Sequence, residues 1–89
     1  DHTNAQLLAE GIADLPGIVL DPGSIKTNII YFDMDNNAME SADFLAALST
    51  KGIKFFDTGP RRFRMVTHYG ITAEDILYTI DAFKQTLAD

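Results

Sequence analysis

Residues 59–68 contain three arginines at a spacing that indicates anion binding. The segment reads Gly-Pro-Arg-Arg-Phe-Arg-Met-Val-Thr-His, a turn signal followed by a short predicted strand. Side chains alternate between the two faces of a strand. One face is expected to carry Arg62, Arg64, Val66 and His68, and the other Phe63, Met65 and Thr67. The second set suits a core. A guanidinium cannot shed its charge, so the first set requires water, a carboxylate or a phosphate, and the two anions fit its planar fork.

A structural explanation of these polar residues stays open beside the functional one. Charged side chains protect exposed edge strands from aggregation, and the spacing of Arg61, Arg62 and Arg64 fits that role equally well. His68 suits either a backbone-bonded strand end or the rim of an active site. For Asp57, hydrogen bonding within a turn is favoured over a role in orienting an arginine.

The composition limits the classes of function. The chain has 89 residues, a net charge of -6 and no cysteine. An acidic balance argues against nucleic-acid binding and against an anionic membrane surface. The absence of cysteine removes disulfides, thiol nucleophiles and thiolate metal sites, and no metal site is predicted. No apolar stretch approaches the length of a membrane span.

The pattern of apolar residues predicts helices and strands in an α/β (α+β) two-layer sandwich. The sheet should be small and mostly antiparallel, with helices packed on one face. Helices are expected at residues 4–14, from an N-cap at Ser41 to Lys51 with Gly52 beyond, and from a capping box at Thr72 to the end; strands are expected at 18–20, 27–34 (central), 53–56 and 61–67, with a turn at 57–60.

Residues 1–89 are expected to form a single domain. The chain starts at Asp1 without an initiator methionine, and helical spacing begins almost at once. This start favours a piece of a longer protein over a complete small one.

Two segments of the sequence resemble one enzyme family. Thr27-Asn28-Ile29-Ile30-Tyr31-Phe32, followed by a predicted helix, a strand at Gly52-Ile53 and then Arg64-Met65-Val66-Thr67-His68, is similar to the C-terminal part of low-specificity L-threonine aldolases. These are pyridoxal-phosphate (PLP) enzymes of fold type I. The resemblance covers roughly residues 4–86, and its motifs are moderately specific.

The resemblance implies that this is the C-terminal small domain of such a lyase. The complete enzyme would cleave L-threonine or L-allo-threonine to glycine and an aldehyde, with PLP held mainly by an upstream large domain. Arg64 would bind the α-carboxylate of the amino-acid substrate, and His68 would be its neighbour. The resemblance also implies a cytoplasmic homo-oligomer, and the isolated chain is expected to be inactive.

One departure from the family pattern and one rival function accompany this interpretation. Family members often continue Val-Thr-His with a hydrophobic residue and an acid, whereas Tyr69-Gly70 follows here. The rival is a stand-alone α/β binding or interaction module, in which the arginine strand would hold a small anion or an acidic tail. Lys26, Lys51 and Lys54 are not expected to form a Schiff base, because nothing in the sequence predicts their desolvation.

Overall fold

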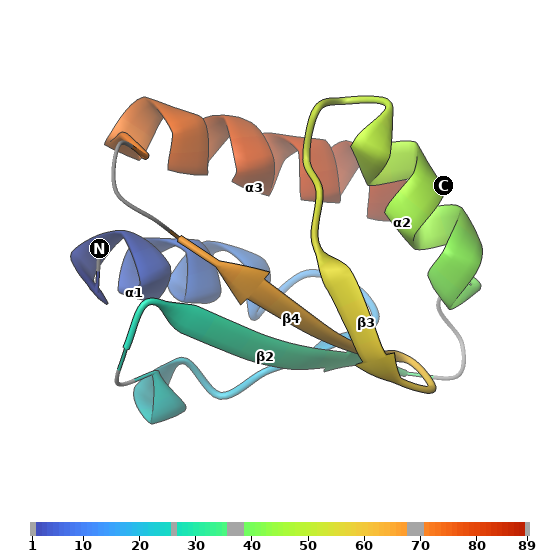
Figure 1. Ribbon diagram of the computed structural model, residues 1–89, viewed down its shortest axis with the longest axis horizontal. Coiled ribbons are helices and arrows are strands. Elements are labelled where there is room, and N and C mark those ends of the chain that lie inside the picture. Colours follow the sequence, from blue (N-terminus) through green and yellow to red (C-terminus); the bar gives the residue numbers. More distant parts are fainter. Residues whose placement is uncertain (1, 26, 36–38, 68–70, 89) are drawn as a thin grey trace.

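The computed structural model describes residues 2–25, 27–35, 39–67 and 71–88 of the chain. Within these residues it is an α+β fold, as predicted, with three α-helices, one 3₁₀ turn and a four-stranded sheet (Figure 1). The elements in chain order are α1 (His2–Ile12), β1 (Ile18–Val19), η1 (Pro22–Ser24), β2 (Ile29–Met34), α2 (Ser41–Ser49), β3 (Phe56–Gly59), β4 (Arg62–Val66) and α3 (Ala73–Leu87). No helix in this part of the chain is both long and apolar enough to cross a membrane.

The sheet is antiparallel throughout, with the strand order β1-β2-β4-β3. β2 is an inner strand, as its apolar sequence predicts. β4 is also an inner strand, so the interpretation of its arginines as charges on an edge strand is wrong. The alternation predicted for residues 62–67 is confirmed, because Phe63, Met65 and Thr67 are buried and Arg62 and Val66 are exposed.

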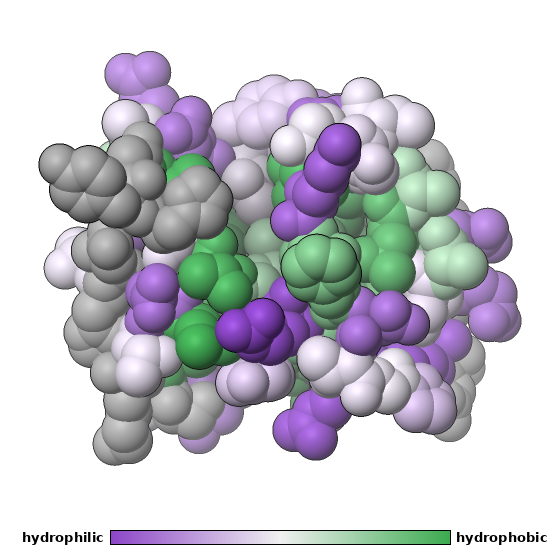
Figure 2. Space-filling model, in the orientation of Figure 1, coloured by the Kyte–Doolittle hydropathy of each residue, from purple (hydrophilic) through white to green (hydrophobic). Residues whose placement is uncertain are grey.

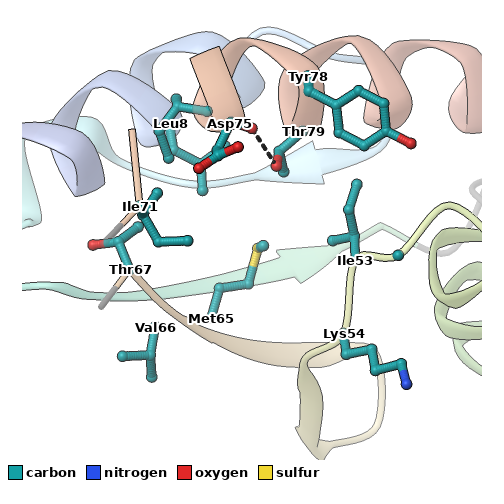
Figure 3. A pocket seen from close by; sticks show the side chains of 12 residues that line it. Leu8, Ile53, Lys54, Met65, Val66, Thr67, Ile71, Asp75, Tyr78 and Thr79 are labelled. Carbon is teal, nitrogen blue, oxygen red and sulfur yellow. Dashed lines mark hydrogen bonds between the residues drawn. The ribbon is translucent and has the colours of Figure 1, made fainter. Parts of the chain in front are cut away.

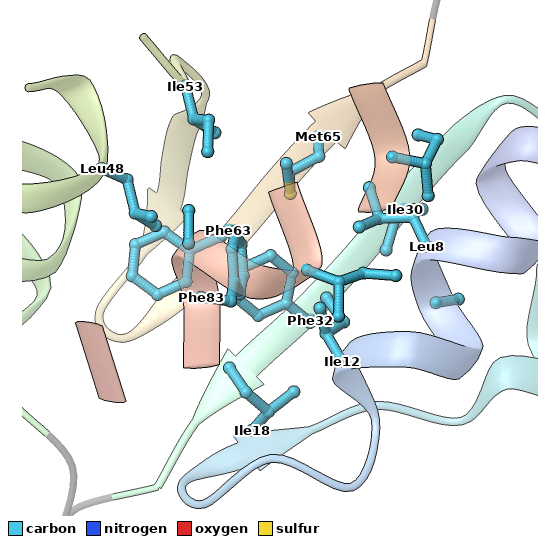
Figure 4. Packing of buried hydrophobic residues seen from close by; sticks show 14 of the residues in the cluster. Leu8, Ile12, Ile18, Ile30, Phe32, Leu48, Ile53, Phe63, Met65 and Phe83 are labelled. Atoms are coloured by element: carbon cyan, nitrogen blue, oxygen red, sulfur yellow. The ribbon is translucent and has the colours of Figure 1, made fainter. Parts of the chain in front are cut away.

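The three helices cover one face of this sheet. α3 packs against both α1 and α2 (Figure 1). The core between the layers is dominated by five phenylalanines, four from β2, α2, β4 and α3 and one from the segment before β3: Phe32, Phe44, Phe55, Phe63 and Phe83. Neighbouring rings lie 5.2–6.4 Å apart between centroids. Figure 4 shows Phe32, Phe63 and Phe83 in this core. Ring pairs at such distances add to the free energy gained by burying their area.

The helix ends follow the expected signals in two cases and depart from them in one. Thr72 and Asp75 form the predicted capping box at the start of α3. Gly52, at φ 82°, follows α2 in the left-handed region. The amides of Gly52 and Ile53 donate to Ser49 and Leu48, which is the Schellman arrangement with glycine at C′. The N-cap of α2 is Glu40 rather than Ser41, and its side chain makes no capping bond.

The edge strand β3 begins later in the sequence than predicted. The sequence predicts a strand at residues 53–56 and a turn at 57–60, but Phe56–Gly59 form the strand, and Phe56 and Asp57 pair with β4. The turn is therefore confined to Pro60 and Arg61. The reason is that Phe55 packs against the core whereas Phe56 faces away from the core. Two consecutive phenylalanines do not reveal from sequence which of them is buried.

Arg61 closes the tight turn between β3 and β4 and ties it to the end of β2. Its backbone has φ 59°, a conformation that residues other than glycine rarely adopt. Its Nε donates to the carbonyl oxygens of Met34 (3.2 Å) and Asp35 (3.1 Å), and its Nη2 donates to those of Asp35 (2.6 Å) and Met39 (3.1 Å). One guanidinium thus satisfies backbone acceptors on both sides of the β2–α2 connection, so Arg61 has a structural role.

Replacing Arg61 by alanine is expected to lower the free energy of unfolding by about 1–3 kcal/mol, because several charge-assisted hydrogen bonds to backbone are lost. Urea unfolding followed by circular dichroism would measure this. Arg62→Ala is the matched control, since it removes the same charge from the next residue. Its exposed ion pair is worth at most about 1 kcal/mol. Equal midpoints for the two variants would contradict the role given to Arg61.

Candidate functional site

The candidate site is centred on Arg64, on the face of the sheet that the helices do not cover, which we call the open face. The open face as a whole carries the outward-facing side chains of the four strands: Val19, Ile29, Tyr31, Asp33, Phe56, Arg62, Arg64 and Val66. Apolar and strongly hydrophilic side chains are interspersed over the strands (Figure 2). Phe56 is 72% exposed and Tyr31 is 49% exposed, although both are large rings. The open face is thus less polar than an ordinary solvated sheet surface.

Arg64 lies in the middle of the open face and differs from Arg62 in its surroundings. Arg62 is exposed and pairs with Asp33, with its Nε 3.4 Å from the carboxylate oxygen. Arg64 is half-buried and has no ion-pair or hydrogen-bond partner for its guanidinium among the described residues. A weakly hydrated, partner-free guanidinium on an inner strand can accept a carboxylate without displacing another anion.

The register of the sheet explains why the two arginines differ. Tyr31 of β2 and Phe56 of β3 lie directly opposite Arg64, one on each side. The corresponding positions beside Arg62 are Asp33 and Gly59. Directly opposed residues on one face have Cβ atoms about 4.5–5.5 Å apart. Arg64 therefore emerges between two rings, whereas Arg62 emerges between a carboxylate and a residue without a side chain.

The Thr27-Asn28 segment and the Val66-Thr67 segment, which belong to the two sequence motifs, meet where β2 begins and β4 ends. The Nδ2 of Asn28 donates to the carbonyl of Thr67 (2.9 Å), and the amide of Thr67 donates to the carbonyl of Asn28 (2.9 Å). The Thr67 hydroxyl donates to the same Asn28 carbonyl (3.2 Å) and is buried. Asn28 directly precedes β2, which begins at Ile29 rather than at residue 27 as predicted. Its side chain has a hydrogen-bond partner there, and the pair fixes the end of β4 two residues beyond Met65.

Two further residues singled out from the sequence are not brought into this site. His68, the predicted neighbour of Arg64, lies outside the described residues. Asp57 is part of β3 rather than of a turn, so its expected turn chemistry is wrong. It stands opposite the buried Phe63, on the other face from the two open-face arginines, and no ion pair joins it to either. Asp57 therefore does not orient Arg62 or Arg64.

The described lysines do not fit a PLP site. Lys51 bonds the hydroxyl of Thr86 (3.1 Å) at the boundary between α2 and α3, and Lys54 and Lys84 are exposed. A Schiff-base lysine needs a desolvated amine, and none of these three has one. PLP would accordingly have to be held by residues outside these positions. No group of three histidine, aspartate or glutamate side chains that could hold a metal ion occurs in the part of the chain that the structure describes.

A cavity of about 400 Å³ lies on the other side of the sheet, between the end of β4, residues 52–54 and the first turns of α3 (Figure 3). Leu8, Ile53, Met65, Ile71 and Ile76 give it an apolar lining, and the Lys54 side chain points away from its centre. The hydroxyl of Thr79 is bonded to the Asp75 carbonyl (2.8 Å), so it is already satisfied. Arg64 does not line this cavity. Asp75 does, but its carboxylate already accepts the capping hydrogen bond from the Thr72 amide (3.0 Å).

Comparison with known proteins agrees with the resemblance read from the motifs. No family model matches the sequence. The chain is 35% identical over 88 residues to low-specificity L-threonine aldolase 1 of Arabidopsis thaliana, which covers 98% of this chain and 25% of that protein. It is 28% identical over 86 residues to probable low-specificity L-threonine aldolase 2 of the same plant, covering 96% and 24%. The chain thus spans about a quarter of the length of these relatives and resembles a fragment of a threonine aldolase.

Proposed function

We propose that this chain is the C-terminal small domain of a PLP-dependent low-specificity L-threonine aldolase. The observation that carries the proposal is the similarity to two threonine aldolases along almost the whole chain. The complete enzyme would be a lyase that cleaves L-threonine or L-allo-threonine to glycine and an aldehyde. An upstream large domain would bind PLP, and the enzyme would work in the cytoplasm as a homo-oligomer.

Within this proposal Arg64 binds the α-carboxylate of the amino-acid substrate. Its position supports the role in three ways: it lies on an inner strand, it is half-buried, and its guanidinium has no anionic partner among the described residues. A carboxylate held by two parallel hydrogen bonds is fixed in orientation as well as in place. His68 enters the proposal as a neighbour of the substrate on its place in the Arg-Met-Val-Thr-His motif alone.

The proposal is tested first at the level of the complete protein. The reading frame that contains this chain should encode an upstream domain, and the purified product with PLP should release an aldehyde and glycine from L-threonine or L-allo-threonine. The 89-residue chain alone should release neither. A complete protein that binds PLP and cleaves neither amino acid would refute the aldolase assignment.

A stand-alone anion-binding module is the second candidate, and it is favoured equally by the guanidinium of Arg64, which has no partner among the residues that the structure describes. Titration of the isolated chain with acetate and glycine, followed by backbone amide shifts, distinguishes the two. Weak shifts confined to the surroundings of Arg62 and Arg64 are expected for an incomplete enzyme site. Tight, saturable binding would favour the stand-alone module.

A further inference from the structure

We propose that Tyr31 and Phe56 are positioning residues for Arg64, forming the two walls of a slot that holds its side chain upright on the open face. This inference rests on the proposed function for its enzymatic consequence, because Arg64 is assigned there to the substrate carboxylate. Within this chain alone, the exposed rings of Tyr31 and Phe56, on the strands either side of β4, restrict Arg64, whose guanidinium has no partner among the described residues.

Both rings are exposed on the open face. Phe56 is 72% exposed and Tyr31 is 49% exposed, while the rings of Phe32 and Phe63, on the same strands as Tyr31 and Arg64, are almost fully buried. Neither exposed ring contributes to the helix-covered core. Exposing these rings to water is unfavourable, and packing in the helix-covered core does not explain why the chain has them there.

The register of the sheet places both rings beside Arg64. Both rings lie at positions directly opposite Arg64, one on β2 and one on β3, so the three side chains form a row across the middle of the open face. The methylene stem of an arginine covers apolar surface readily while its charged end stays free. Arg62, two residues away on the same face, has no ring beside it and is exposed. The half-burial of Arg64 thus follows from its two neighbours.

Restricting the Arg64 side chain lowers the free-energy cost of binding a carboxylate. Ordering a long side chain on binding costs free energy, and that cost falls when the side chain is already restricted in the free protein. Apolar rings beside the guanidinium also exclude water and strengthen its hydrogen bonds to an anion. Tyr31 and Phe56 would accordingly act through Arg64 and need not touch the substrate.

The enzymatic test is a set of variants in the complete protein. Tyr31→Ala and Phe56→Ala are each expected to raise KM for L-threonine by roughly 3- to 10-fold, with kcat changed less than about twofold. Tyr31→Phe should restore the wild-type KM, because the ring is what restricts Arg64. Val19→Ala, which removes another exposed apolar side chain from the open face, is the control and should leave KM unchanged.

Coupling to Arg64 separates positioning from a general structural effect. In an Arg64→Lys background, Tyr31→Ala and Phe56→Ala should change KM by less than about 1.5-fold, since residues that act through one partner are not additive. An undiminished effect in that background would overturn the proposal. So would a wild-type KM in both alanine variants.

A measurement on the 89-residue chain keeps this inference independent of the aldolase assignment. The NMR order parameter of the Arg64 Nε–H group should fall in Tyr31→Ala and in Phe56→Ala and stay unchanged in Val19→Ala. If the order parameter falls while the complete protein shows no aldolase activity, the proposed function fails and the slot stands. An unchanged order parameter in both ring variants overturns the slot whatever the enzyme does.

Discussion

Replacing Arg64 by lysine in the complete enzyme is expected to raise KM for L-threonine sharply and to lower kcat/KM by about 10- to 100-fold. This range corresponds to about 1.5–3 kcal/mol, the free energy typical of a hydrogen bond to a charged group. Lysine keeps the positive charge, but it is a point charge without the planar fork that binds a carboxylate through two parallel bonds. The loss would therefore report on geometry rather than on net charge.

Arg62→Lys is the matched control for this experiment. Arg62 lies two residues away on the same strand and the same face, and it already pairs with Asp33. Its replacement should leave kcat/KM within about twofold of the wild type, because an exposed ion pair contributes little. Near wild-type kinetics for Arg64→Lys, or equal losses of kcat/KM in the two variants, would show that Arg64 does not bind the substrate carboxylate.

Replacing Phe44 by alanine is expected to lower the free energy of unfolding by about 3–5 kcal/mol, the range measured for buried phenylalanines. Phe44 is fully buried, and its ring contacts Phe32, Phe55, Phe63 and Phe83 at centroid distances of 5.4–6.4 Å. A domain of this size has a total stability of roughly 4–13 kcal/mol. The variant should therefore melt at a much lower temperature or populate the unfolded state at 37 °C.

Phe56→Ala offers a control within the same chain. It removes the same ring from a position that is 72% exposed, so unfolding should change by at most about 0.5 kcal/mol. Urea and thermal unfolding by circular dichroism would measure both variants. Similar midpoints for Phe44→Ala and Phe56→Ala would contradict the central place given to the phenylalanine cluster.

The sequence was sufficient for features that depend on local periodicity. Alternation placed Phe63 and Met65 inside and Arg62 outside, and the threonine–aspartate pair at 72 and 75 marked the start of α3. The start of β3 could not be predicted in the same way. Phe55 and Phe56 are equally apolar, and only the pairing of Phe56 with Arg64 decides which ring enters the core.

The composition of the open face depends on pairing between distant segments, so the sequence alone did not reveal it. Arg64 was a candidate from its residue type and spacing, but its two ring neighbours come from strands that begin 35 residues before it and 8 residues before it, at Ile29 and Phe56. The one available signal was Tyr31, which alternates with the buried Ile30 and Phe32 and so had to face outward. Nothing in the sequence showed that it would stand beside an arginine.

The inner position of β4 also constrains when the molecule can fold. β4 is the last strand in the chain, yet it lies between β2 and β3 and pairs with both. Until residues up to Val66 have left the ribosome, β2 lacks its inner partner and β3 has no partner in the sheet. Pairing across such sequence separations is slow, because the loop between the strands must close before contacts form. Folding during synthesis should therefore occur as one late event, and nascent chains stalled before residue 62 should remain sensitive to protease.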